Sequence, residues 1–232
     1  MPKEQADTIH LGGVVSCGRL YLDDLEFNMP NGQHVKVSKT FKPDIMKNLI
    51  ARHRGRYHLL GLFCRPGMKV LDFPCGSGYA AVLLKDQGII YEGRDMDGPT
   101  LEYARRLYGS QTAAKFKFGD LERPDLGEEK YDLVGCLEGI EHIGKDSQGP
   151  LVEAIYNALK KNGVLVISSP ENSTGISGPG RDNKWHKWEL NRDDFLSLLA
   201  VFGENNVELI TLRETLHTGV MSICFYAVCH KS

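Results

Sequence analysis

The run Val70–Gly78 constrains the fold more than any other part of the chain, because a short apolar segment passes there directly into a glycine-containing turn. The turn leads into Tyr79–Leu84, which has the composition of a helix. Glycines let a ligand approach the backbone closely, and the N-terminus of a helix presents unpaired N–H groups. This strand–turn–helix order predicts an α/β fold that binds a nucleotide-like ligand beside the turn.

Two acidic residues near this turn indicate which kind of ligand it suits. Asp95 ends the next apolar segment, about 20 residues after Asp72, and a carboxylate there can accept hydrogen bonds from both hydroxyls of a ribose. The dinucleotide fingerprint G-x-G-x-x-G would require a third glycine at the position of Ala81. Asp72 stands just before the turn, where an acid suits a ligand with a cationic amino group better than a pyrophosphate.

The rest of the chain alternates between strand-like and helix-like segments, which implies a parallel sheet covered on both faces. We therefore predict a Rossmann-like α/β fold with a seven-stranded, mostly parallel sheet, helices on both faces and a closing hairpin. The predicted strands are 68–73, 89–95, 115–118, 131–137, 163–169, 206–213 and 219–229. The predicted helices are 43–63, 77–87, 98–108, 149–161 and 191–202, with Asn162–Gly163 as the C-cap of the helix at 149–161.

The first 41 residues form an N-terminal extension in this interpretation, and residues 42–232 form the main domain. The dipeptide Asn31–Gly32 lies between two short alternating runs, Leu25–Asn28 and His34–Val37. Asn-Gly in this position is a strong signal for a two-stranded hairpin, because both residues tolerate a positive φ. We therefore expect a β-hairpin in the extension, followed by the helix at 43–63.

Composition excludes several classes of function. The formal net charge of −2 disfavours non-specific binding of nucleic acid, which normally requires a basic domain. The six cysteines form no C-x-x-C pair or zinc spacing, which favours buried thiols in a reducing compartment. Neither a signal-peptide core nor a membrane span of about 20 apolar residues is present. We expect a cytoplasmic protein and leave open whether it is a monomer or a homodimer.

The motifs together resemble those of class I methyltransferases that use S-adenosylmethionine. The resemblance rests on Val70–Gly78, on Gly93–Asp97 and on Phe118–Leu121, which occur in the usual order and spacing. It departs from the family at Pro74, where many members carry glycine. The resemblance implies S-adenosylmethionine as cofactor, with Asp95 on the ribose and Asp120 on the adenine. The cofactor-binding residues that it implies are Tyr57, Asp72, Pro74, Gly76, Gly78, Asp95, Met96, Asp120, Leu121 and Leu137.

A second group of chemically active residues follows the strand predicted at 131–137. Glu138, Glu141 and His142 would share a face if this segment were a turn of helix. His186 lies in a Gly-, Ser- and Pro-rich loop at 170–190, and a loop of this length is usually functional. Two carboxylates with imidazoles can bind a divalent cation, or a histidine can serve as a general base.

Two groups of methyltransferases resemble this second constellation. Small-molecule and glycan methyltransferases (types 11 and 23) show a similar pattern and need no metal, whereas small-RNA 3′-terminal 2′-O-methyltransferases carry a similar metal-binding set. The resemblance implies His142, Glu141 and His186 as catalytic residues. The alternative metal set is Glu138, Glu141, His142 and His186. We favour methyl transfer to a hydroxyl of a small molecule or sugar over a metal-dependent RNA enzyme, because the chain is slightly acidic; a non-catalytic, cofactor-binding scaffold is the third alternative.

Overall fold

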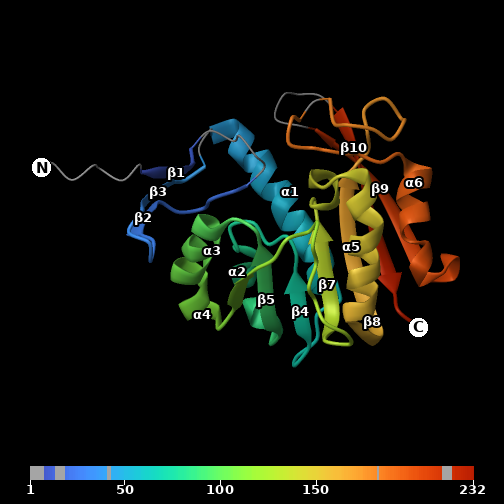
Figure 1. Cartoon of the computed structure of the whole chain (residues 1–232), viewed down its shortest axis with the longest axis horizontal. Coiled ribbons are helices and arrows are strands. Elements are labelled where there is room, and N and C mark those ends of the chain that lie inside the picture. The colour runs from blue at the N-terminus through green and yellow to red at the C-terminus, as the bar shows by residue number, and fades with distance from the viewer. Residues whose placement is uncertain (1–7, 14–18, 41–42, 182, 216–220) are drawn as a thin grey trace, which may run out of the picture.

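The computed structural model describes residues 8–13, 19–40, 43–181, 183–215 and 221–232. Its centre is a seven-stranded sheet in the order β6-β5-β4-β7-β8-β10-β9, with helices on both faces (Figure 1). Strand β10 runs antiparallel to both of its neighbours, β8 and β9, whereas the pairs among β4, β5, β6, β7 and β8 are parallel. The predicted Rossmann-like fold class is therefore confirmed. The strands are β4 (Lys69–Asp72), β5 (Ile90–Asp95), β6 (Lys115–Phe118), β7 (Tyr131–Leu137), β8 (Leu159–Pro170), β9 (Val207–Thr215) and β10 (Met221–His230).

The helices form two layers, one on each face of this sheet. The helices are α1 (Pro43–Leu62), α2 (Ala80–Leu83), α3 (Gly98–Ala104), α4 (Ser110–Thr112), α5 (Lys145–Ala158) and α6 (Arg192–Leu198). A π-helical segment, Arg105–Gly109, joins α3 to α4. Alternation along β4 separates the layers, because Val70 packs in a core with α1, α2 and α3, whereas Leu71 packs in a core with α5 and α6. No described helix is long and apolar enough to span a bilayer.

The predicted helix at 149–161 is wrong at both ends. Helix α5 begins at Lys145 and ends at Ala158, and Leu159 already belongs to β8 and pairs with Tyr131. The side chain of Leu159 is fully buried, so packing of this leucine in the core ends the helix early. Asn162, with φ 62°, instead forms an irregular step inside β8, and its N–H donates to the carbonyl oxygen of Lys231. The expected C-cap at Asn162–Gly163 is therefore absent.

The predicted N-terminal hairpin is present as β2 (Leu25–Asn28) paired antiparallel with β3 (His34–Ser38). A further strand, β1 (Ile9–Gly12), which the sequence analysis missed, pairs parallel with β3. This small sheet lies beside α3 (Figure 1). Leu20 and Tyr21, which precede the hairpin, pack in the same core as α3.

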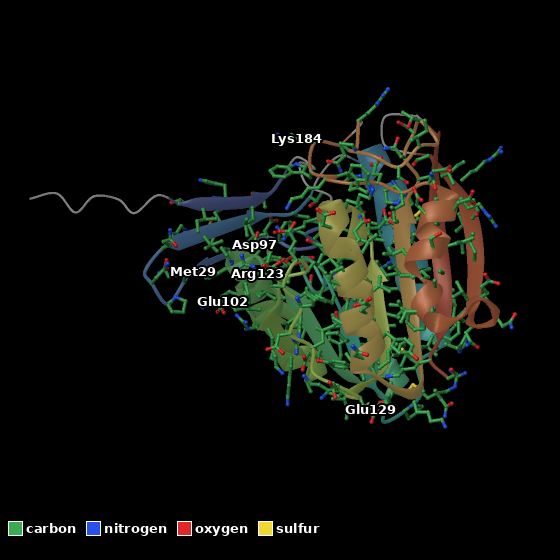
Figure 2. The ribbon with its side chains drawn as sticks, turned by 45° about the vertical axis from the view of Figure 1, so that its right-hand side comes forward. Met29, Asp97, Glu102, Arg123, Glu129 and Lys184 are labelled. Carbon is green, nitrogen blue, oxygen red and sulfur yellow. The ribbon has the colours of Figure 1, made fainter. Side chains whose placement is uncertain are left out.

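The carboxyl ends of the parallel strands meet along one edge of the sheet, which we call the rim. Figure 2 shows Lys184, from the loop after β8, and Glu129, which precedes β7, at opposite ends of the molecule. Lys184 marks the rim side. Ligands of parallel α/β sheets bind at this edge, so the fold brings the predicted motifs to the expected place.

Candidate active site

Asp72 lies beneath the glycine-containing turn, with its side chain fully buried. The hydroxyl of Tyr91 donates to Oδ2 at 2.5 Å and the hydroxyl of Tyr57 donates to Oδ1 at 3.4 Å. Burial raises the pKa of Asp72 to about 7, although both tyrosine bonds oppose the shift. The Asp72 carboxylate therefore faces two tyrosines in the core, and it can act on a ligand only through the turn above it.

The turn itself is shaped by close packing on one side and open space on the other. Gly78, at φ 80°, leaves no room for a side chain, because a Cβ there would lie 2.6 Å from Phe116. Gly76, at φ 53°, has open space where its Cβ would stand. The ring of Pro74 packs against Gly139, where a Cβ would come within 2.3 Å of Pro74 Cδ. The turn thus offers a half-buried stretch of backbone with open space beside it at Gly76, and close packing supports it from behind.

Asp95 ends β5 with its carboxylate fixed against this turn. Its Oδ2 accepts the backbone N–H of Gly76 at 3.1 Å, and its Oδ1 accepts the backbone N–H of Asp97 at 3.0 Å. The side chain is only 3% exposed, and burial raises its pKa while Arg19 opposes the shift. The carboxylate is therefore a preorganised acceptor beside Gly76, where the sequence analysis predicts a ribose. The sequence analysis missed Arg19, which lies 2.7 Å from Oδ1.

Apolar side chains stand exposed at the ends of the next two strands. Met96 follows β5 and is 62% exposed, and Phe118 ends β6 and is 65% exposed. Asp120 forms the turn after β6, where its Oδ1 accepts the backbone N–H of Glu122 at 2.9 Å. Leu121 is buried beside Gly139. This part of the rim offers apolar surface and a carboxylate, which suits a flat ring with an amino group; Phe118 was not among the predicted residues.

Glu138 does not share a face with Glu141, contrary to the expectation of a helical turn. It has φ 52° and directly follows Leu137, the buried last residue of β7. Its Oε2 lies 2.9 Å from the Arg56 guanidinium, and its Oε1 accepts the Ser168 hydroxyl at 2.9 Å. Burial alone would raise the pKa of Glu138, but Arg56 and the hydrogen bonds hold it below the usual value. Glu138 is thus the charged partner of Arg56.

Glu141 is 1% exposed, and neither carboxylate oxygen has a hydrogen-bond partner among the residues that the structure describes. Burial and the nearby charge of Glu138 raise its pKa well above the usual range. Buried polar atoms are normally hydrogen-bonded, so a carboxyl group without partners is the exception that needs explanation. Potential ligand atoms of Glu141, His142 and His186 lie within 4.8 Å of one another.

His142 belongs to the short 3₁₀ turn Ile140–His142 and faces His186, with the two ring centroids 5.0 Å apart. Its Nδ1 lies 3.0 Å from the backbone oxygen of Trp185. A carbonyl can only accept, so Nδ1 carries the hydrogen and Nε2 of the neutral ring carries a lone pair. Burial, followed by the neighbouring His186, lowers the pKa of His142 and favours this neutral form.

The loop between β8 and α6 brings His186 to this cluster. Its Nδ1 lies 2.5 Å from Oε1 of the buried Glu189, and its Nε2 lies 2.7 Å from the side-chain amide of Asn183. Glu189 is anchored in turn by backbone bonds in both directions with Gly178. The sequence analysis did not single out Glu189 as a site residue, although its position three residues after His186 was visible.

Two tryptophans in the same loop enclose the cluster. Trp185 is half-exposed and Lys184 lies over its ring, at 5.0 Å from the centroid. The backbone N–H of Trp188 donates to the backbone oxygen of Glu141 at 3.2 Å, and Lys145 lies over the Trp188 ring. The loop is therefore fastened directly to the segment after β7, which joins the second constellation to the rim that carries the cofactor motifs.

Comparison with known proteins agrees with this geometry. The model of a methyltransferase domain family matches residues 46–217, which is more than half of the chain. A "probable S-adenosylmethionine-dependent methyltransferase" of Mycolicibacterium smegmatis is 32% identical over 66% of this chain and 57% of its own length. A ubiquinone biosynthesis O-methyltransferase of Photobacterium profundum is 32% identical over 56% of this chain and 54% of its own. The chain thus spans little more than half the length of these curated relatives.

Solved structures share the fold at low sequence identity. A methyltransferase of Methanosarcina mazei, described as dependent on S-adenosylmethionine, has a TM-score of 0.60 at 12% identity and covers 75% of this chain and 96% of its own. A phosphoethanolamine N-methyltransferase of Haemonchus contortus has a TM-score of 0.63 at 15% identity and covers 76% and 52%. The family match, together with the rim geometry, places this chain in the methyltransferase domain family, among the class I methyltransferases that depend on S-adenosylmethionine.

Proposed function

We propose that this protein transfers the methyl group of S-adenosylmethionine to a hydroxyl of a small molecule or a sugar. The observation that carries the proposal is the bond from Nδ1–H of His142 to the backbone oxygen of Trp185, which leaves Nε2 as the basic nitrogen at the same rim as the preorganised Asp95 carboxylate. Relatives named as O-methyltransferases of ubiquinone biosynthesis favour a small-molecule acceptor.

The rim residues fit the cofactor part by part. Asp95 would accept the ribose hydroxyls, and the backbone at Gly76 would lie against the ligand, because open space stands there. Met96, Asp120 and Leu121 would hold the adenine. Asp72, supported by Tyr57, would favour the cationic amino group of the cofactor through the turn. Pro74, Gly78 and Leu137 would shape the surface behind this turn. The bound cofactor would supply a methyl group on a positively charged sulfur.

The chain's own contribution to the reaction is positioning, proton removal and exclusion of water. A hydroxyl must lose its proton when its oxygen is methylated, and Nε2 of His142 is the base that we propose receives it. The Nδ1–H bond to the backbone of Trp185 fixes the ring orientation. Burial raises the pKa of Glu141, and in its protonated form this side chain can donate a hydrogen bond to the acceptor oxygen. Trp185 and the loop around His186 would cover the acceptor while it reacts.

The experiment is an activity screen with labelled cofactor and a panel of phenols, polyols and sugars, followed by the variant His142→Ala. We expect the rate to fall by roughly 10²- to 10⁴-fold, the usual contribution of a general base, with cofactor binding retained. His34→Ala is the matched control, because His34 lies exposed on the small N-terminal sheet. Methyl transfer by His142→Ala at the wild-type rate would refute the assignment of this base.

A metal-assisted form of the same reaction is the second candidate, and one observation favours it. Both oxygens of Glu141 are buried without described partners, beside His142 and His186. One carboxylate and two imidazoles suit manganese, iron, cobalt or zinc better than magnesium. Nε2 of His186 would have to release the Asn183 amide before it could bind a metal. Glu138, the fourth predicted ligand, is instead paired with Arg56. In this metal-assisted alternative, the methyl acceptor would be the 2′-hydroxyl at the 3′ end of an RNA.

Elemental analysis of the purified protein, with turnover measured before and after chelation, separates the two forms. If His142 acts without a metal, chelation should leave the rate unchanged. A stoichiometric transition metal, with turnover abolished by chelator and restored by that metal, would establish the metal-assisted form instead.

A further inference from the structure

The segment just before the N-terminal hairpin touches the elements of the cofactor site, although it lies outside residues 46–217 that match the family model. The backbone oxygen of Leu20 accepts the hydroxyl of Ser77, which belongs to the glycine-containing turn, at 2.5 Å. The hydroxyl of Tyr21 lies 2.7 Å from the Thr100 hydroxyl, at the start of α3. Arg19 is therefore delivered to the rim by a segment that is anchored on both sides of Asp95.

Arg19 bridges two carboxylates at the end of β5. One guanidinium nitrogen lies 2.7 Å from Oδ1 of Asp95, and the other lies 2.7 Å from Oδ2 of Asp97. The Arg19 side chain is 26% exposed, so it covers the buried Asp95 carboxylate from the solvent side. Figure 2 shows Asp97 near Met29, which belongs to the turn of the hairpin, at the left of the view.

The lone pairs of Asp95 decide whether a ribose can bind beside Arg19. Each carboxylate oxygen accepts about two hydrogen bonds. Oδ2 accepts one from the backbone of Gly76 and has room for a second, whereas Oδ1 already accepts the backbone N–H of Asp97 and the Arg19 guanidinium. A ribose diol needs one place on each oxygen. The N–H of Asp97 is fixed at the start of α3, so Arg19 is the donor that can leave.

We propose that Arg19 is a cofactor-site residue that occupies Asp95 in the ligand-free protein and yields this carboxylate to the ribose. The inference rests on the proposed role of Asp95 in cofactor binding. The bond of Arg19 to Asp95 has to break, whereas its bond to Asp97 can hold the guanidinium at the edge of the site. Competition between guanidinium and ribose thus weakens cofactor binding, and the N-terminal segment sets the affinity of the main domain.

The variant Arg19→Ala tests this competition by calorimetry on the full chain with S-adenosylhomocysteine. We expect binding to tighten by about 3- to 10-fold, because a partly exposed ion pair no longer has to be broken. Arg106→Ala is the matched control: Arg106 bonds Glu102 at 2.7 Å and reaches the backbone oxygen of Asn28 in the same small sheet, away from Asp95. Its affinity should match that of the wild type.

A second ligand isolates the ribose. The 2′,3′-dideoxy analogue of S-adenosylhomocysteine has no diol to compete with Arg19, so Arg19→Ala should bind it no more tightly than the wild type does. Unchanged or weaker binding of S-adenosylhomocysteine by Arg19→Ala, or an equal gain with both ligands, would overturn the inference. Arg19→Gln replaces the alanine variant if circular dichroism shows that the latter does not fold. A wild-type chain that binds neither ligand would overturn the cofactor site itself, which is a distinguishable failure.

Discussion

Replacing Asp72 by asparagine should make the protein more stable at neutral pH, and the gain should grow as the pH rises. The folded protein raises the pKa of Asp72 from 3.8 to about 7, chiefly by burial. Between these values the folded state keeps a proton that the unfolded chain has lost, so the free energy of unfolding falls as pH rises. The full stability is present below about pH 4 and is reduced above about pH 7. Asparagine cannot ionise and escapes this loss.

The size of the effect follows from the difference between the pKa of Asp72 in the unfolded chain, 3.8, and in the folded protein, about 7. At 1.36 kcal/mol per unit, ionisation of Asp72 costs the wild type about 4 kcal/mol of stability above pH 7. The two tyrosine hydroxyls can donate to the amide oxygen or accept from the amide nitrogen, so Asp72→Asn keeps its partners. The difference in stability between variant and wild type should therefore change by up to about 4 kcal/mol between pH 4 and pH 8.

Urea unfolding at half-unit steps of pH measures this difference, with the slope m checked at each step. Asp132→Asn is the matched control, because folding lowers the pKa of Asp132 whereas it raises that of Asp72. Asp132 bonds Lys160 at 2.8 Å and the backbone N–H of Lys69 at 2.7 Å, and its pKa is lowered despite burial. Asp132→Asn should cost stability at neutral pH and lose its effect in acid. A stability difference for Asp72→Asn that is independent of pH would refute the argument that folding raises the pKa of Asp72 to about 7.

Two further predictions concern cofactor binding. Asp95→Ala should weaken binding of S-adenosylhomocysteine by about 1.5–3 kcal/mol, through loss of charge-assisted bonds to the ribose, and calorimetry that finds unchanged affinity would remove Asp95 from the site. Asp120→Ala should weaken binding modestly and leave the melting temperature close to that of the wild type, because among the described residues its carboxylate bonds just the exposed turn at Glu122; a large drop in melting temperature would show that Asp120 is structural.

The local parts of the site could be predicted because their causes lie within a few residues. Gly76 and Gly78 adopt positive φ in a turn between a strand and a helix, and this need is visible in the sequence itself. Asp95 could be predicted because the end of a parallel strand places its last side chain at the rim. His142 and His186 were expected in one cluster from their chemistry, and the structure brings their rings within 5.0 Å.

Glu138 illustrates where local reasoning fails. The spacing of Glu138 and Glu141 suggested one face of a helix, but the 3₁₀ turn begins only at Ile140. The partners of Glu138 come from α1, β8 and β10, far away along the chain. Spacing cannot reveal such partners, because the sheet order decides which strands stand beside β7.

The sequence by itself determined the order of strands and helices in the main sheet, the glycine-containing turn and the edge of the sheet at which the candidate site lies, because short-range backbone preferences and side-chain alternation control these features. Only the tertiary structure decided the early end of α5 at Ala158, the raised pKa of Asp72 between Tyr57 and Tyr91, and the contact of Arg19 with Asp95. Each of these depends on burial or charge supplied by residues distant in the chain, which become neighbours only when the sheet and the N-terminal segment have packed together.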